Sequence, residues 1–244
     1  MGKEDKGQVS VFIIIAIIFI ILIILGFIAY QTNLITIGSS KIHPDVSSVY
    51  DRLSSCIKQR SIDALGLVGL QGGYVLLPPA YLETNISNVA FALHNQKNTL
   101  ISLKEMERQI ESYIDLTVPY CIQEIEELDI KPGKAQSHVT IINDVKISVS
   151  FPLSVSKGAS TYTLKNPYEY SFDIRLKKIH ETANEIINKQ LENREYVDLT
   201  FLSDLEPHTS FIYVDDKNGL YVITDEQSIL DDIEYSFMFG VELR

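Results

Sequence analysis

The chain has 244 residues, 45% of them hydrophobic, and a formal net charge of -11 at pH 7. This length is enough to bury a hydrophobic core as one domain or as two closely packed subdomains. Because an acidic surface repels phosphate backbones, we expect no nucleic acid among the partners.

An apolar segment comes first in the chain. From Val9 to Tyr30 there are 22 residues without a charge, which as a helix would span roughly 33 Å. The segment is longer than the apolar region of a cleaved secretory signal, and no small-x-small site follows it. We therefore predict a retained transmembrane helix at residues 8–31, with the lipid bilayer as its partner.

The charges beside this segment predict its orientation. Lys3 and Lys6 precede it, whereas the next cation, Lys41, lies eleven residues beyond Tyr30. Positive charge favours the cytoplasmic side. Residues 1–7 are therefore predicted to be a cytoplasmic leader, residues 32–44 a linker, and residues 45–244 an extracytoplasmic domain of a cell-membrane protein.

The residues before the apolar segment resemble a known signal. Lys6-Gly7-Gln8 resembles the class III signal peptides of archaeal type IV pilin-like precursors, in which a membrane peptidase cuts after the glycine and leaves the helix in place. The resemblance implies a cut between Gly7 and Gln8, and Ser10 agrees with the Gln-x-Ser start of many such precursors. Phe12 stands where many pilins carry an acidic residue, so the resemblance does not imply filament assembly. An ordinary polar flank of a signal anchor is the other reading, and both stay open.

The predicted domain is of the α+β class, with amphipathic helices packed on antiparallel sheet. An apolar period of three to four predicts a first helix over Asp45–Leu67, which the glycines of residues 69–73 end. A short strand is predicted over Tyr74–Leu77, and Val89–Leu93 should pair with Thr99–Leu103 as a hairpin. The whole layout, including residues 65–74, is similar to a group of uncharacterised archaeal single-pass membrane proteins, a resemblance that implies no activity.

The second half of the domain should alternate in the same way. A second helix from Leu103 to Thr117 restarts after Pro119, with Cys121, Ile125 and Leu128 on its apolar stripe. The remaining predicted elements are a meander of residues 139–142, 145–155 and 161–164, a helix over Ile174–Asn193, a hairpin of Phe211–Val214 with Leu220–Thr224, and a strand over Tyr235–Leu243. In that last strand Tyr235, Phe237 and Phe239 should share one face.

The two cysteines are predicted to form a disulfide bond. Cys56 and Cys121 border the apolar stripes of the first two helices, and the predicted compartment permits disulfides. Two free buried thiols are the alternative.

Motifs for chemistry are missing from the sequence. Its five histidines have no zinc-site spacing, and neither His-Glu-x-x-His nor Gly-x-Ser-x-Gly occurs. The acidic clusters, including Asp215-Asp216 and Asp225-Glu226, lack the spacing of a calcium loop and are interpreted as solvated faces. No catalytic, cofactor-binding or metal-binding residue is therefore assigned.

One modification site is a candidate. Asn85-Ile86-Ser87 is an Asn-x-Ser triplet on the predicted outer side of the membrane. Glycosylation of Asn85 would require that it lie on an accessible loop.

These features favour a membrane-anchored cell-surface protein with a structural or binding role, for example a pilin-like or pseudopilin-like subunit. Its partners would then be envelope proteins or like subunits. Two alternatives stay open, namely an anchored extracytoplasmic hydrolase with a dispersed active site and an accessory subunit of a larger membrane complex.

Overall fold

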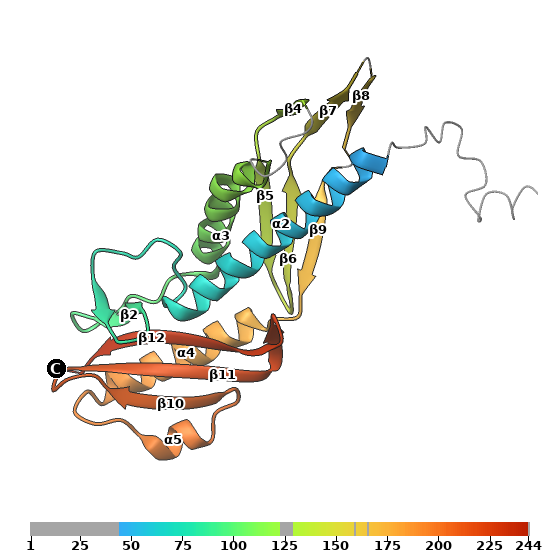
Figure 1. The fold of residues 1–244 in the computed structure, drawn as a ribbon. Coiled ribbons are helices and arrows are strands. Elements are labelled where there is room, and N and C mark those ends of the chain that lie inside the picture. The colour runs from blue at the N-terminus through green and yellow to red at the C-terminus, as the bar shows by residue number, and fades with distance from the viewer. Residues whose placement is uncertain (1–43, 123–128, 159, 165, 244) are drawn as a thin grey trace, which may run out of the picture. The chain divides into compact units, whose positions relative to one another are not determined.

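The computed structural model describes residues 44–122, 129–158, 160–164 and 166–243 (Figure 1). The predicted leader, membrane helix and cut site, and the linker up to residue 43, lie outside these ranges. None of the helices within them is both long enough and apolar enough to cross a lipid bilayer.

The described chain is an α+β fold, as the sequence predicted. Its elements are α2 (Pro44–Leu70), β1 (Tyr81–Glu83), β2 (Asn88–His94), β3 (Lys97–Asn98), α3 (Leu103–Thr117), the 3-10 helix η1 (Val118–Ile122), β4 (Asp129–Pro132), β5 (Gln136–Ile141), β6 (Val145–Ser150), β7 (Leu153–Lys157), β8 (Ser160–Thr163), β9 (Tyr168–Phe172), α4 (Leu176–Glu192), α5 (Leu199–Ser203), β10 (His208–Tyr213), β11 (Asn218–Leu230) and β12 (Ile233–Glu242).

Three sheets are built from these strands. The largest has the order β1-β2-β12-β11-β10, with β3 paired to β2, and the two smaller ones are β4-β7-β8 and β5-β6-β9. All strand pairs are antiparallel except the parallel pair of β2 with β12. One buried apolar cluster runs through α2, α3, α4 and the two sheets that contain β6 and β12.

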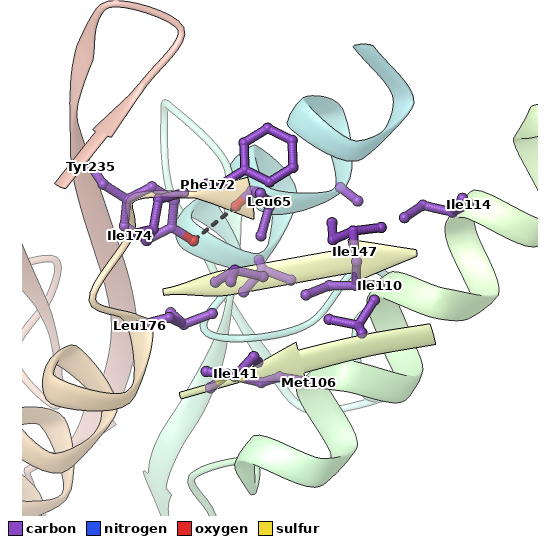
Figure 2. Packing of buried hydrophobic residues seen from close by; sticks show 14 of the residues in the cluster. Leu65, Met106, Ile110, Ile114, Ile141, Ile147, Phe172, Ile174, Leu176 and Tyr235 are labelled. Atoms are coloured by element: carbon purple, nitrogen blue, oxygen red, sulfur yellow. Dashed lines mark hydrogen bonds between the residues drawn. The ribbon is translucent and has the colours of Figure 1, made fainter. Parts of the chain in front are cut away.

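Helix α2 packs on the β5-β6-β9 sheet and also reaches β12 (Figure 2). The apolar stripe that predicted this helix is buried, with Val49, Leu53, Ile57, Ala64, Leu65 and Val68 at most 2% exposed. Tyr50 stacks on Tyr168 of β9 with ring centroids 5.3 Å apart. Further along the helix, the Tyr235 hydroxyl of β12 donates to the Leu65 carbonyl at 2.8 Å. This one helix therefore contacts both sheets.

The end of α2 approaches β12 so closely that a glycine is required at position 69. A Cβ atom at Gly69 would lie 2.5 Å from the Ser236 carbonyl oxygen, so no larger residue fits unless the backbone shifts. Gly72 and Gly73 follow with positive φ angles of 71° and 93°. These are the residues that turn the chain away from the helix, as the sequence predicted.

A disulfide bond joins Cys56 of α2 to Cys121 of η1, the pairing that the sequence led us to expect. The two Cα atoms are 5.9 Å apart and the residues are 65 positions apart in the chain. The bond fixes the end of the α3–η1 segment against α2. The predicted continuation through Ile125 and Leu128 lies outside the described residues.

The last strand and its helix agree with the predicted pattern. Tyr235, Phe237 and Phe239 of β12 are all buried on one face, at most 3% exposed. α4 covers this face with a buried stripe that includes Ile179, Ala183 and Ile186. The predicted hairpin is present as β10 and β11, although β11 continues to Leu230.

Two predicted strand arrangements before α3 are wrong. Tyr74–Leu77 is not a strand, because the N–H groups of Val75 and Leu76 donate to the Gln109 side chain of α3 instead of to a neighbouring strand. In the predicted hairpin the first strand is present as β2, but Thr99–Leu103 is not a strand. Asn95 and Gln96 make a tight turn with φ angles of 49° and 62°, so the strand that pairs with β2 is Lys97–Asn98, directly after this turn.

The predicted meander is divided between two sheets. Residues 145–155 are not one strand, because Phe151-Pro152 separates β6 from β7 and proline has no N–H to donate to a ladder. β6 therefore pairs with β5 and β9, whereas β7 pairs with β4 and β8. The strands β1, β4 and β9 and the short helix α5 were not predicted from the sequence.

The disulfide bond generates the first prediction. Reduction should lower the free energy of unfolding by about 2–4 kcal/mol, because the unfolded chain regains the freedom of a long closed loop. Denaturant unfolding with and without a reductant measures this difference. The double variant Cys56→Ser/Cys121→Ser should not respond to the reductant, and an equal midpoint for the reduced and oxidised wild type would contradict the expectation.

Candidate functional site

A row of carboxylates on α3 faces the edge of β5. Glu107, Glu111 and Asp115 are spaced by four residues, so their side chains lie on one stripe of the helix. β5 is an edge strand, because β6 is the one strand that pairs with it among the described residues. α3 lies along its unpaired edge. The edge of β5 would otherwise present unpaired backbone groups.

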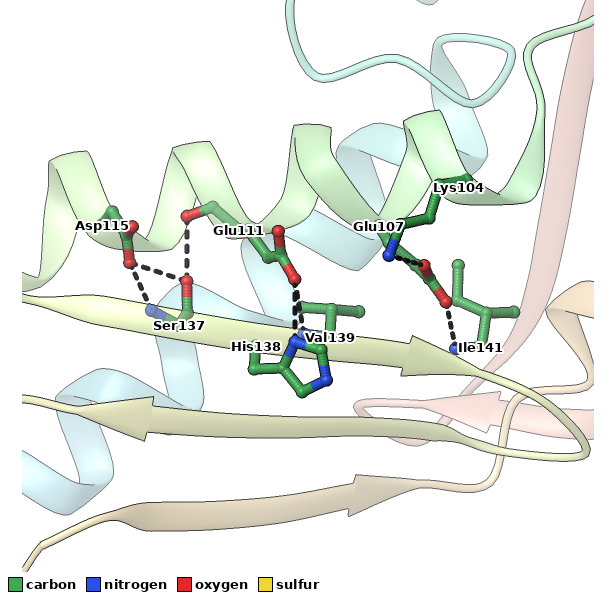
Figure 3. A network of polar contacts seen from close by, with 8 residues as sticks. All are labelled: Lys104, Glu107, Glu111, Asp115, Ser137, His138, Val139 and Ile141. Carbon is green, nitrogen blue, oxygen red and sulfur yellow. Dashed lines mark hydrogen bonds and ion pairs between the residues drawn. The ribbon is translucent and has the colours of Figure 1, made fainter.

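The carboxylates accept hydrogen bonds from every second N–H of β5 (Figure 3). Ile141 N–H donates to Glu107 Oε1 at 2.9 Å, Val139 N–H to Glu111 Oε1 at 2.9 Å, and Ser137 N–H to Asp115 Oδ1 at 2.7 Å. Four helical residues rise about 6 Å and two strand residues about 6.8 Å, so the two spacings match. We call this set the carboxylate ladder.

Further contacts hold the ladder in place. The Ser137 hydroxyl lies 2.7 Å from Asp115 Oδ1 and 3.0 Å from the Glu111 carbonyl oxygen. Lys104 Nζ lies 3.2 Å from Glu107 Oε2, and His138 Nδ1 lies 3.4 Å from Glu111 Oε1. Since each carboxylate already accepts a backbone N–H, the ladder stabilises the sheet edge.

The open face of the β5-β6-β9 sheet carries a hollow. Its volume is about 390 Å³, and its lining includes side chains from all three strands, namely His138, Thr140, Lys146, Ser148, Glu169 and Ser171. These residues alternate along the strands with the buried ones that pack under α2. Ile147 and Tyr170 also line the hollow, so it offers apolar contact as well as hydrogen-bonding groups.

Two further hollows have polar groups with partners of their own. One of about 270 Å³ lies beside the end of α4, where the Gln190 amide accepts from Tyr221 at 2.7 Å and donates to the Asn193 carbonyl at 2.8 Å. The other, of about 370 Å³, adjoins the β2–β3 turn, where Glu242 accepts the Asn95 N–H at 2.7 Å. Both arrangements tie chain segments together.

The prediction that Asp225 lies on a solvated face is wrong. This residue is buried and pairs with Arg175, whose Nε and Nη2 atoms lie 2.9 and 2.5 Å from its two oxygens. Ser228 and the Gln227 N–H also donate to it. Burial alone would raise the pKa of this carboxyl, but the hydrogen bonds from Arg175, Ser228 and Gln227 outweigh it and hold the pKa below its ordinary value.

The histidines are separate in the structure. His180 Nε2 lies 2.8 Å from the Ile101 carbonyl oxygen, and burial lowers the pKa of its imidazole. His94 lies 3.4 Å from Glu242, and His208 is exposed on β10. Within the described ranges, no group of three or more His, Cys, Asp or Glu side chains could hold a metal ion.

Asn85 lies on an exposed turn between β1 and β2. The Thr84 hydroxyl accepts the N–H groups of Ile86 and Ser87 at 3.2 Å, which shapes this turn. The triplet is therefore accessible to solvent. Gly7 and Gln8, the predicted cut site, lie outside the described residues.

No protein-family model, curated protein sequence or solved structure matches the chain.

The ladder generates a second prediction. Glu107→Ala should lower the free energy of unfolding by about 1–3 kcal/mol, because the buried N–H of Ile141 loses its acceptor. Denaturant unfolding at neutral pH measures the loss. Glu181→Ala on the exposed side of α4 is the matched control, expected within about 0.5 kcal/mol of wild type. Equal effects of the two substitutions would contradict the assigned role.

A third prediction concerns the buried ion pair. Asp225→Ala should cost about 3 kcal/mol at pH 7, because it leaves the Arg175 guanidinium without its partner. Since the pKa of Asp225 is lowered in the folded state, its stabilisation is complete above the ordinary carboxyl pKa near about 4 and is lost as the pH falls through the lowered value. Wild-type and variant stabilities should therefore converge in acid. The exposed neighbour Glu226→Ala serves as the control, and a pH-independent gap would refute the prediction.

Proposed function

We propose that the protein is a membrane-anchored cell-surface protein of the pilin-like or pseudopilin-like class, with a structural or binding role and its folded domain outside the cytoplasm. Residues 8–31 would anchor it in the bilayer. The Lys6-Gly7-Gln8 leader would be removed by a membrane peptidase. Its partners would be envelope proteins or like subunits.

The observation that carries this proposal is the position of α2 in the chain. The first described helix, which follows the apolar segment and the linker, is the central helix of the domain core rather than a peripheral attachment. Its stripe is buried against two sheets and Cys56 bonds it to η1. A force applied at the N-terminal anchor would therefore reach the core directly, which suits a tethered surface protein.

Two further features support an extracytoplasmic domain. A disulfide bond persists in an oxidising compartment and is rare in the cytosol of most organisms. The exposed Asn85 turn would be available to a glycosylation enzyme outside the membrane.

A structural or binding role is favoured over catalysis by the use of the polar groups. The ladder carboxylates, Asp225 and Gln190 are engaged with backbone or side-chain partners. The alternative of an anchored hydrolase has one observation in its favour, since His138 and Ser148 are paired across β5 and β6 and both line the hollow on the open face of the sheet. A hydrolase would require that His138→Ala abolish turnover of some peptide or glycan substrate.

The processing claim is the fourth prediction. The mature protein isolated from its own membranes should begin at Gln8, and Gly7→Val should leave the leader attached because a bulky residue replaces the one at the cut. Mass spectrometry of the intact N-terminus measures both. Gly2→Val is the control and should be processed as wild type.

An intact Met1, or a leader still bearing Lys6, in the wild-type protein would overturn the pilin-like proposal. The anchor is tested separately, because the cut and uncut forms should both remain with the membrane after washing at alkaline pH. Release of either form by that wash would overturn the anchor.

A further inference from the structure

The edge of β10 differs from the edge of β5. β10 ends the largest sheet and pairs only with β11. Whereas the carboxylate ladder covers β5, the second half of β10 lies on the surface, with Ile212 51% and Tyr213 63% exposed. Val214, directly after the strand, is 38% exposed.

Backbone groups point outward along this half of the strand. The Val214 N–H donates to the Asn218 carbonyl at 3.0 Å, beside the last strand pair, Tyr213 with Gly219. Because antiparallel residues alternate between facing their neighbour and facing away, the N–H and carbonyl groups of Phe211 and Tyr213 point away from β11. Apart from hydrogen bonds between paired strands, no backbone hydrogen bond within the described ranges involves the N–H or carbonyl groups of Phe211 and Tyr213.

Charged side chains, proline and a bulge, three devices that protect sheet edges, are absent from this stretch, although the short helix α5 contacts β10. From Thr209 to Val214 the sequence Thr-Ser-Phe-Ile-Tyr-Val contains no charge and no proline, and the pairing with β11 shows no bulge. On one face of this stretch, Phe211 and Tyr213 contact edge to face with centroids 4.8 Å apart. An uncharged edge without a bulge is a template for another strand.

We propose that β10 is an interaction surface at which two copies of this chain pair edge to edge, antiparallel, with the symmetry axis at Ile212. In this register Phe211 of one copy lies opposite Tyr213 of the second copy, twice by symmetry. Ile212 lies opposite Ile212. Aromatic pairs then occupy one face of the new ladder and an aliphatic pair the other, so the strand is complementary to itself.

The self-complementary pairing of Phe211 with Tyr213 and of Ile212 with Ile212 favours a second copy as the occupant. Two chains of net charge -11 repel one another over most of their surfaces, but this register places no ionisable groups opposite each other within the ladder. Pairing at β10 does not involve the N-terminal helix, and it therefore stands independently of the proposed function.

Site-directed crosslinking of the full chain in detergent tests the register. Directly opposed residues of a non-hydrogen-bonded antiparallel pair have Cα atoms about 4.5 Å apart, within the range of a disulfide bond. Ile212→Cys, oxidised with diamide, should therefore give a covalent dimer in high yield. Ser210→Cys is the matched control, because the same register separates the two Ser210 positions by four residues along the ladder. Both native cysteines are already bonded.

Sedimentation at increasing concentration gives an independent readout. Wild type should dimerise reversibly, and Ile212→Lys should weaken association at least tenfold by placing two cations opposite each other. Ile86→Lys, on an exposed loop, should associate as wild type. Equal crosslinking of both cysteine variants, a monomeric wild type, or capture of Ile212→Cys only by a different protein in intact cells would overturn the proposal.

Discussion

Every strand at the edge of a sheet carries backbone N–H groups that need an acceptor, and the side chains of α3 provide it along β5. A helix cannot offer its own carbonyl groups, because its internal hydrogen bonds use them. Carboxylates at four-residue spacing can replace them, because their separation along the helix is close to two residues of strand. This match lets the apolar stripe of α3, with Met106, Ile110 and Ile114 at 0% exposure, close the side of the core.

Helix α2 depends on that closure. It lies over the three-stranded β5-β6-β9 sheet, whose β5 edge is closed by α3. With α3 at one edge and β12 reached through Tyr235, the same helix contacts two sheets and the disulfide partner Cys121. The Arg175–Asp225 pair adds a polar link between the chain leaving β9 and the irregular part of β11. The two sheets are therefore parts of one core.

Periodicity predicted the elements whose partners lie on one clear face. The stripes of α2, α3 and α4 and the aromatic alternation of β12 are regular, so their existence and buried faces followed from the residues alone. The errors fall where a tertiary contact decides. Tyr74–Leu77 has strand-like residues, but Gln109 takes its N–H groups. Pro152 divides a run that alternates well on both sides.

The carboxylate ladder shows why the candidate site was harder to predict than the fold. Glu107, Glu111 and Asp115 have a readable spacing, yet nothing local distinguishes them from a solvated helix face until β5 is placed beside them. Asp225 is a similar case, since its burial depends on Arg175, 50 residues earlier in the chain. Acidic residues are the least informative signal in a chain of this charge.

Hydrogen exchange at individual amides tests most directly the claim that one sheet edge is closed and the other open. The amides of Val139 and Ile141 should exchange slowly at every protein concentration, because the ladder protects them. Those of Phe211 and Tyr213 should exchange fast in dilute solution and more slowly as the concentration rises, with Ile212 as the protected internal reference. Fast exchange at Val139 and Ile141, or rates at Phe211 and Tyr213 that do not change with concentration, would contradict the account.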